Sequence, residues 1–299
     1  MVGDISMKKK ITSYQVFSLV NTLVMLFIMF VTAYPIYYVV VASISDPSAL
    51  YRHSGMLWYP LAPYTLEAYR GVLGNEQIIS GFANTIFVLV VGVLINIILT
   101  TMGAFFLSLK GPMLKNTLAN MIIFTMYFGG GLVPSYLNVK ELGLINTLWA
   151  LIIPGAINTM NLIIMRTAFQ GIPDSLIESA RLDGASYLRI LTKIMIPLSK
   201  ATIAVLVLYY GVAHWNAWFN ASIYLQNSKL YPLQLVVHRI LDLTVMSDMI
   251  TSSDISEMAQ AADLIKYALI VVTTVPILVL YPFVQKYFTK GVMIGAVKG

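Results

Sequence analysis

The chain has 299 residues, of which 58% are hydrophobic and only 11% are charged, and its mean hydropathy is +0.79. A soluble globular domain has about 45–50% apolar and about 25% charged residues, so this composition excludes that class and predicts an integral membrane protein. The chain has no cysteine, which excludes thiol catalysis, disulfide bonds and thiolate metal sites. The net charge of +6 comes from scattered basic residues without interleaved aromatic residues, so we expect no nucleic-acid partner.

Six long stretches of the chain carry no Asp, Glu, Lys or Arg, and a membrane-spanning helix needs about 20 predominantly apolar residues. We therefore predict an all-α integral membrane fold with six transmembrane helices. Their expected ranges are Val16–Val41, Gly81–Leu109, Leu118–Val133, Asn146–Phe169, Thr202–Ile223 and Ala262–Phe288.

Lysine and arginine indicate the orientation, because cytoplasmic loops of membrane proteins carry an excess of both. With the N-terminus inside, 13 of the 19 basic residues lie on the cytoplasmic side, including Lys8, Lys9 and Lys10. We therefore expect a multi-pass protein of the cell membrane, in contact with the lipid bilayer and with both termini in the cytoplasm.

The sequence also shows a proline within the first span, a glycine-rich end of the third span and two long outer loops. The first span contains Pro35, and neighbouring helices can satisfy the backbone groups that a kink there would free. The loop Ser45–Ser80 is rich in Pro, Tyr and Trp58, which fits an interfacial aromatic belt. Three glycines, Gly129–Gly131, end the third span, and the outer loop Gln226–Gln260 is the longest polar section.

The densest charge lies in residues 173–197, between the fourth and fifth spans and on the cytoplasmic side; we call this segment the elbow. Pro173 suits the first turn of a helix, because its missing N–H would have no partner there. Asp174 and Ser175 can cap the same end. The start of the elbow therefore predicts a short, well-defined helix.

The second half of the elbow predicts a turn and another helix. Gly184 permits a conformation that a side chain would oppose. Ser186 can cap a second helix, which Pro197 ends. Glu178 lies where the helix dipole disfavours an anion, so it needs a cation, either Arg181 or one on a partner. A partner that holds the first helix would move both adjoining spans.

The elbow also has a recognisable spacing. Its key residues are Glu178, Ser179, Ala180, Gly184 six residues after Glu178, Ile194 and Pro197. This pattern resembles the EAA loop of permease subunits of ABC importers, where the permease touches its ATPase, with Ser179 in place of the usual Ala. An ordinary amphipathic loop with a local ion pair is the alternative interpretation.

Segments outside the elbow extend the resemblance over residues 15–299. Leu142–Thr147 and Gln285–Gly299 resemble the corresponding parts of carbohydrate-importer permeases of the maltose-transporter MalG type. Met126–Pro134 is similar to the LplC/YtcP branch, whose members serve complex oligosaccharides. The chain is thus identified as resembling the permease subunits of carbohydrate-uptake ABC importers.

The resemblance implies a type I ABC importer permease fold (MetI-like) with cytoplasmic EAA coupling helices. It implies a permease that forms half of the translocation path for a sugar or oligosaccharide. Its expected partners are a second, homologous permease subunit, two ATP-binding cassette subunits and an extracellular solute-binding protein or lipoprotein. No cofactor is expected, and without a Walker A sequence the chain is expected to be no enzyme, so ATP hydrolysis comes from the partner ATPase.

The resemblance also implies a division of the chain and roles for single residues. The expected parts are a cytoplasmic N-terminus (1–15), a first transmembrane helix with its outer loop (16–80), the permease transmembrane domain (81–288) and a cytoplasmic tail (289–299). The residues expected to couple to the ATPase are Glu178, Ser179, Ala180, Asp183, Gly184 and Ala185. Gly291–Gly299 would reach between the ATPases. The residues expected in a scoop that enters the binding protein are Met246, Ser247, Asp248, Asp254 and Glu257.

Polar and aromatic residues within the spans are candidates for the substrate path. They are Asn84, Asn158, Asn161, His214, Trp215, Asn216, Trp218 and Asn220. Sugars are bound by amide and hydroxyl hydrogen bonds and flat aromatic faces, which the run 214–220 offers. The alternative, favoured for any single residue, is hydrogen bonding between helices and an interfacial aromatic belt. We expect no metal site, because the three histidines have no metal-ligand spacing.

Three other functions remain as alternatives. A secondary transporter needs no such elbow, and no acidic residue lies in the charge-free stretches to couple protons or sodium. An intramembrane enzyme would need a metal cluster or a nucleophile with its base, and the spans contain neither a His-Glu-x-x-His nor a Gly-x-Ser-x-Gly motif. An ABC permease for another solute, such as a polyamine or amino acid, is the strongest alternative.

Overall fold

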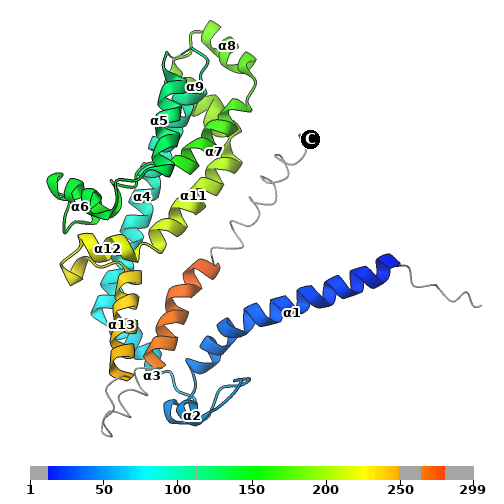
Figure 1. The fold of residues 1–299 in the computed structure, drawn as a ribbon, viewed down its shortest axis with the longest axis vertical. Helices are drawn as coiled ribbons and strands as arrows, with labels where there is room; N and C mark the ends of the chain where they lie inside the picture. The colour runs from blue at the N-terminus through cyan, green and yellow to red at the C-terminus, as the bar shows by residue number, and fades with distance from the viewer. Residues whose placement is uncertain (1–12, 112, 249–263, 280–299) are drawn as a thin grey trace, which may run out of the picture. The chain divides into compact units, whose positions relative to one another are not determined.

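The computed structural model describes residues 13–111, 113–248 and 264–279, and every regular element within them is a helix (Figure 1). These residues divide into two compact units. The first unit comprises residues 13–70 and 264–271, and the second comprises residues 71–248 and 272–279. The all-helical prediction is confirmed for the residues described.

The first unit begins with α1 (Ser13–Ala42), a single helix of 30 residues that continues through Pro35. Its length matches the first predicted span. The short helix α2 (Pro47–Arg52) follows, with Asp46 as its N-cap. The Asp46 carboxylate accepts hydrogen bonds from the Ser48 hydroxyl and the Ala49 N–H, which hold its pKa below the usual value. Helix α3 (Glu67–Gly74) leads into the second unit.

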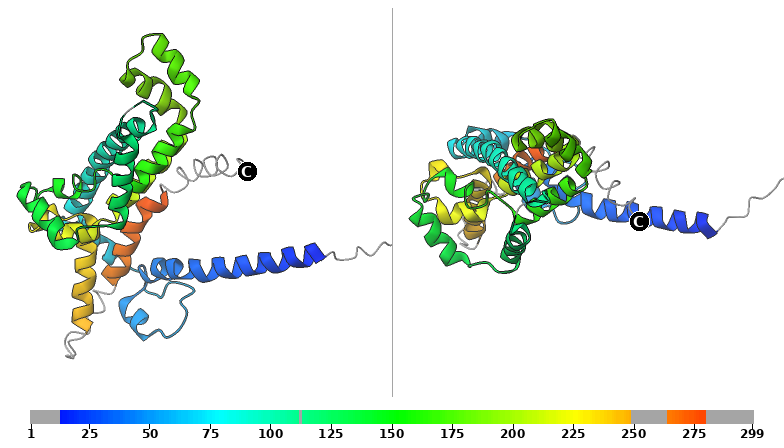
Figure 2. Two further views of the ribbon diagram at one scale, coloured as in Figure 1. Left: turned by 45° about the horizontal axis from the view of Figure 1, so that its top comes forward. Right: turned by 90° about the horizontal axis from the view of Figure 1, so that it is seen from above.

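The second unit is organised around α4 (Glu76–Ser108), a helix of 33 residues whose first turn is capped by the Asn75 side chain. One face of α4 is buried and carries small or polar side chains three to four residues apart. These residues are Thr85, Val88, Gly92, Asn96, Thr100 and Ala104. Small side chains allow α7 and α11 to pack closely against this face. Figures 1 and 2 show the three helices side by side.

The third predicted span is two helices and not one. Helix α5 (Lys115–Tyr127) and helix α6 (Leu132–Glu141) meet at an angle of 118°. Gly131 between them has φ of +86°, a conformation that side chains oppose and glycine accepts. The glycine corner was predicted, but a helix that continues to Val133 is wrong.

The fourth predicted span is helical only in its second half. A short 3-10 helix, η1 (Leu148–Leu151), is followed by non-helical backbone over 152–158 and by α7 (Thr159–Gln170). Pro154 and Gly155 lie in the non-helical part, where both residue types oppose a continuous α-helix. The prediction of one helix over Asn146–Phe169 is therefore wrong for its first half.

The elbow contains α8 (Asp174–Leu182), α9 (Tyr187–Ile190), a π-helical turn η2 (Leu191–Met195) and α10 (Ile196–Leu198). Pro197 has no N–H to donate, which is consistent with the wider turn just before it. The helical segment does not end at Pro197, as predicted, but continues to Leu198.

Beyond Ser199 the chain bends by 86° into α11 (Lys200–Trp215). Helix α11 ends earlier than the predicted span, and α12 (Trp218–Tyr224) follows after a break. A 3-10 turn, η3 (Ser228–Leu230), and α13 (Leu233–Asp248) complete this part of the second unit. A further helix occupies Leu264–Val279.

Among the described residues, two helices are long and apolar enough to cross a membrane alone: Val16–Ala42 and Glu76–Ser108. The pairs α5 with α6 and α9–α10 with α11 also pass when each bent pair is taken as one span, which gives up to four. The elbow lies at one end of the second unit, and α12 and α13 lie toward the other end (Figures 1 and 2).

Candidate functional site

The turn between α8 and α9 is a Schellman motif centred on Gly184. The Gly184 N–H donates to the Arg181 carbonyl at 3.0 Å, and the Ala185 N–H donates to the Ala180 carbonyl at 2.9 Å. Gly184 has φ of +77°, the left-handed conformation that this motif requires and that glycine adopts without strain. The predicted glycine turn is confirmed, and Asp183 is the C-cap residue of α8.

Small side chains let the elbow pack against the core of the second unit. Ala180 and Ala185 both contact a buried cluster that includes Met165, Phe169 and Ile190. They are also the two positions whose side chains meet across a Schellman turn. The alanines therefore fix the angle at which α8 leaves the core.

The start of α8 is held by an ion pair and not by a capping side chain. No side-chain capping hydrogen bond occurs there, so the predicted caps Asp174 and Ser175 do not act as caps. Asp174 instead pairs with Lys110, which follows the end of α4. The hydrogen bond and the charge of Asp174, and to a smaller extent the charge of Glu178, raise the pKa of the Lys110 ammonium.

A pocket of about 690 Å³ lies between the end of α4 and the elbow. Its charged lining consists of Lys110, Asp174, Glu178 and Arg181. The Arg181 guanidinium lies over the Tyr187 ring at 5.3 Å, and none of the ion pairs in the described residues includes Glu178. Of the two cations that the sequence suggested for Glu178, Arg181 therefore does not pair with it.

The elbow exposes apolar side chains beside its charges. Leu182 is 89% exposed and Leu188 is 67% exposed, and none of the residues of α8 is buried. Ser179 turns its hydroxyl to the Leu176 carbonyl of the same helix. Exposed leucines at the tip of a polar segment are typical of a surface that another protein covers.

Among the predicted path residues, His214 lies in the interior. Its Nε2 lies 2.7 Å from Asn96 Oδ1, and the Asn96 amide donates to the Gly155 and Ala156 carbonyls at 3.1 and 2.8 Å. Gly92 leaves the space that the imidazole occupies, since a Cβ there would lie 2.6 Å from His214 Nε2. His214 and Asn96 together thus join α11, α4 and the non-helical segment before α7.

Asn158 and Asn161 also make contacts within the helical packing. The Asn158 side chain caps α7 by accepting from the Asn161 N–H at 3.1 Å. The Asn158 N–H donates to the Tyr210 hydroxyl at 3.0 Å, and that hydroxyl lies 2.7 Å from Thr100 Oγ1. Tyr210 and Thr100 are therefore parts of the same buried contact.

The remaining candidates lie closer to α12 and the loop after it. Asn84 donates to the Lys229 and Tyr231 carbonyls at 2.8 and 3.2 Å and so holds that loop. Trp215 is buried, and its Nε1 has no hydrogen-bond partner within the described parts of the chain. Asn216 is exposed and donates to the Val212 carbonyl at 3.0 Å.

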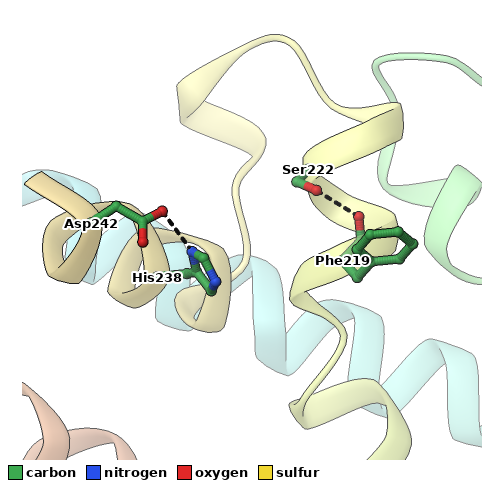
Figure 3. A network of polar contacts seen from close by, with 4 residues as sticks. All are labelled: Phe219, Ser222, His238 and Asp242. Atoms are coloured by element: carbon green, nitrogen blue, oxygen red, sulfur yellow. Dashed lines mark hydrogen bonds and ion pairs between the residues drawn. The ribbon is translucent and has the colours of Figure 1, made fainter.

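Trp218 and Asn220 are both residues of α12. The Trp218 ring stacks on the His238 ring of α13 with centroids 4.0 Å apart, and Asn220 is exposed. His238 Nδ1 lies 2.9 Å from Asp242 Oδ2. Figure 3 shows His238 facing Asp242 on α13, with Phe219 on the neighbouring α12. Helix α13 thereby adds polar groups to an aromatic surface.

The structure describes part of the predicted scoop and none of the predicted C-terminal tail. Met246, Ser247 and Asp248 form the last turn of α13. Asp254, Glu257 and Gly291–Gly299 lie outside the described residues. Within the ranges that are described, no three His, Asp or Glu residues come together in a way that could hold a metal ion.

Asn146 is a structural residue that was not singled out from the sequence. It has φ of +61°, its N–H donates to the Tyr224 carbonyl at 2.8 Å, and its Oδ1 accepts from the N–H groups of Gln226 and Asn227 at 3.1 and 2.9 Å. Asn146 therefore ties the loop before η1 to the loop after α12. The sequence could have indicated this residue only through its place in Leu142–Thr147, the segment that resembles carbohydrate-importer permeases.

Comparisons with known proteins identify the family and the fold of the chain. Residues 112–294 match the family described as binding-protein-dependent transport system inner membrane component. Protein LplC of Bacillus subtilis (strain 168) is 39% identical over 287 residues, which cover 95% of this chain and 96% of LplC. The polygalacturonan/rhamnogalacturonan transport system permease protein YtcP of the same organism is 41% identical over 240 residues, 79% of this chain and 82% of YtcP.

A solved structure has the same fold. It is a chain of a bacterial ABC transporter involved in the import of the acidic polysaccharide alginate. The sequences are 32% identical, the TM-score is 0.84, and the match covers 92% of this chain and 98% of that one.

Proposed function

This chain belongs to the family of binding-protein-dependent transport system inner membrane components, and we propose that it forms half of the translocation path of an ATP-driven importer for a sugar or oligosaccharide. It is the permease component, and ATP hydrolysis is carried out by a separate subunit. The single observation that carries the proposal is the elbow, which has a Schellman turn at Gly184 and exposed leucines. The chain that contains it has the fold of a known importer subunit.

The relatives support a carbohydrate as the solute. YtcP is described as a permease for polygalacturonan and rhamnogalacturonan, and the similar solved structure is of an importer of alginate. Another relative, AraQ of Halalkalibacterium halodurans, is described as a permease for arabinooligosaccharides and is 25% identical over 276 residues. A carbohydrate built of several sugar units is the class that these three descriptions share.

We further propose the assembly that such a permease requires. A second homologous permease would complete the path, two ATP-binding cassette subunits would bind on the cytoplasmic side, and a binding protein would deliver the solute from outside. Six spans with both termini in the cytoplasm would place the elbow on the ATPase side, in agreement with the excess of Lys and Arg there.

The elbow is proposed to seat in the ATPase. Glu178, Ser179 and Ala180 lie on α8, and Asp183, Gly184 and Ala185 form the turn that follows. The packing of the two alanines against the core supports this role, because a rigid attachment passes a movement of α8 to the helices behind it. Glu178 is open to a cation of the partner.

For the substrate path, the candidates on and just before α12 are better supported than those in the packing of α4, α7 and α11. Asn216, Trp218 and Asn220 are exposed, and together they offer amide groups and an aromatic surface to a sugar. Asn161 and His214 are buried, and the exposed Asn158 caps α7 and donates its N–H to Tyr210 of α11. We propose that these three residues hold the helices that present Asn216, Trp218 and Asn220.

Affinity purification of this chain from its native membrane in mild detergent, with mass spectrometry of the eluate, tests the proposal. We expect an ATPase, a second permease and a solute-binding protein in the eluate. Elution alone or as a homo-oligomer contradicts it. The recovered binding protein is then screened with oligosaccharides, and failure to bind any sugar would favour a permease for another solute.

A further inference from the structure

The loop after α1 combines exposed aromatic side chains with an absence of charge. Residues 53–66 contain no Asp, Glu, Lys or Arg, whereas Arg52 precedes and Glu67 follows them. Large apolar side chains of this segment are exposed: Met56, Trp58, Tyr59, Tyr64 and Leu66. Trp and Tyr in such a surface are typical of the interface between lipid and water.

This loop does not extend away from α1 but returns along it. The Trp58 ring stacks on the Phe30 ring with centroids 6.0 Å apart and an interplanar angle of 19°. It also contacts the Tyr34 ring, with centroids 5.6 Å apart. Both partners lie well before the end of α1 at Ala42.

The position of Phe30 along α1 gives the depth of this contact. The hydrocarbon core of a bilayer takes up about 20 residues of a helix. Any such stretch that begins after the charged Lys10 and ends by Ala42 contains Phe30. Phe30 is therefore at hydrocarbon depth wherever α1 sits in the bilayer, and Trp58 stacks directly against it.

Backbone groups of the loop are satisfied by side chains of the span and its end. The Leu57 N–H donates to the Tyr34 hydroxyl at 2.8 Å, and the Tyr37 hydroxyl donates to the Trp58 carbonyl at 2.5 Å. The Leu61 N–H donates to Ser45 Oγ at 3.1 Å. Non-helical backbone near lipid needs such partners, because water is not there to supply them.

We propose that residues 53–66 form an interfacial loop that inserts into the outer leaflet of the bilayer, with Trp58 at the edge of the hydrocarbon core. The partner is the lipid surface itself. The side of the membrane rests on the proposed orientation of the chain, whereas the depth rests only on α1 as a membrane span. Such a loop fixes the depth of α1, because it links the span to the headgroup layer.

The absence of cysteine in the wild-type chain allows a direct measurement of depth. Tyr59→Cys places a single thiol in the loop, and Arg52→Cys places a matched control at the charged end of α2. Each variant is labelled with a bimane fluorophore in the assembled transporter, purified by a tag on this chain and reconstituted into vesicles. The wild-type assembly, treated identically, gives the background from partner subunits.

Two quenchers then distinguish lipid, water and protein surroundings. We expect phosphatidylcholine brominated near the top of its acyl chain to quench the label at position 59 about twofold more than the label at position 52, as interfacial placement requires. Aqueous iodide should show the opposite order. Quenching at position 59 by iodide as strong as at position 52 overturns the proposal, and so does quenching by neither reagent, which indicates cover by another protein.

A second variant tests how the loop is held. Tyr37→Phe in the Tyr59→Cys background removes the donor to the Trp58 carbonyl and keeps the ring. The label should become more accessible to iodide if the tyrosine hydroxyl holds the loop at depth, and unchanged quenching contradicts that part. Sugar-dependent ATP hydrolysis by the same vesicles reports on the proposed function separately.

Discussion

At Gly184 a single backbone conformation sets the shape of the elbow. Its φ of +77° closes the Schellman turn, and no atom lies within 4 Å of the position that a Cβ would take. A side chain there would therefore project freely from the turn, toward the surface proposed to meet the ATPase. The position is sensitive to charge more than to size.

We predict that Gly184→Asp abolishes transport and leaves membrane insertion intact, because it adds a second carboxylate beside Asp183 at the docking surface. Gly184→Asn is the matched control, since Asn has the same size and both residues tolerate a positive φ. Uptake of the labelled sugar is measured together with the amount of chain in the membrane. Wild-type uptake by the Asp variant would contradict the coupling role.

Gly92 is the opposite case, a position that is sensitive to size. A Cβ there would lie 2.6 Å from His214 Nε2, and the imidazole is held by Asn96. We predict that Gly92→Ala destabilises the protein by about 1–3 kcal/mol, the usual cost of overpacking a core. Gly211→Ala on α11 meets no atom within 4 Å and should be neutral or stabilising. Thermal unfolding in detergent compares the two, and equal stability of both variants contradicts the prediction.

At this scale the sequence predicted the turn residues better than the buried contacts. Gly184 and Ser186 were identified because their conformation and capping depend on neighbours in the chain, and Ser186 Oγ does accept from the Arg189 N–H at 3.3 Å. Asn96 and Tyr210 were not identified. Their partners lie more than 50 residues away, so no local pattern marks them.

At the scale of helices, α4 and α8 are joined by the Lys110–Asp174 pair and by the packing around Phe105. The Phe105 ring meets the rings of Phe169 on α7 and Tyr187 on α9, with centroids 6.4 Å apart in each case. The elbow is therefore attached to α4 through the ion pair and through the contact of Tyr187 with Phe105, and the same Phe105 ring packs against α7. This gives the elbow a second connection besides the chain itself.

We predict that Lys110→Asp lowers transport relative to ATP hydrolysis, because like charges would replace the pair with Asp174. The double variant Lys110→Asp with Asp174→Lys should recover coupling, and failure of that rescue contradicts a role for the pair. Asp174 raises the pKa of Lys110 above its usual 10.5. The contribution of this ion pair to the attachment of the elbow is therefore fully present below pH 10.5. It is lost as the pH rises through the raised pKa.

Continuous helices were predictable, and broken ones were not. The charge-free stretches predicted the ends of α1 and α4 to within a few residues. A long apolar stretch is enough to identify a helix that can span the membrane. The same measure treated the residues before α7 as helical, although 152–158 are not. Hydropathy does not register a break when the residues remain apolar, and the Asn96 amide that donates to this non-helical backbone is far away in the chain.

At the scale of the whole molecule, the distribution of Lys and Arg predicts that both termini face the cytoplasm. Single cysteines in place of Ser6 and Lys298 should therefore resist a membrane-impermeant maleimide in intact cells and react after permeabilisation. A cysteine in place of Asn227, an exposed residue of a loop that the same distribution predicts to lie outside, should react in both conditions. Reaction of either terminus in intact cells would reverse the assignment of sides.

The 86° bend at Ser199 has a mechanical consequence for the second unit. A displacement of the α9–α10 segment along its own axis has almost no component along α11, since the two axes are nearly perpendicular. It would therefore push the near end of α11 sideways. Tyr210 and His214 bond α11 to α4, so such a sideways displacement of α11 would load these two contacts.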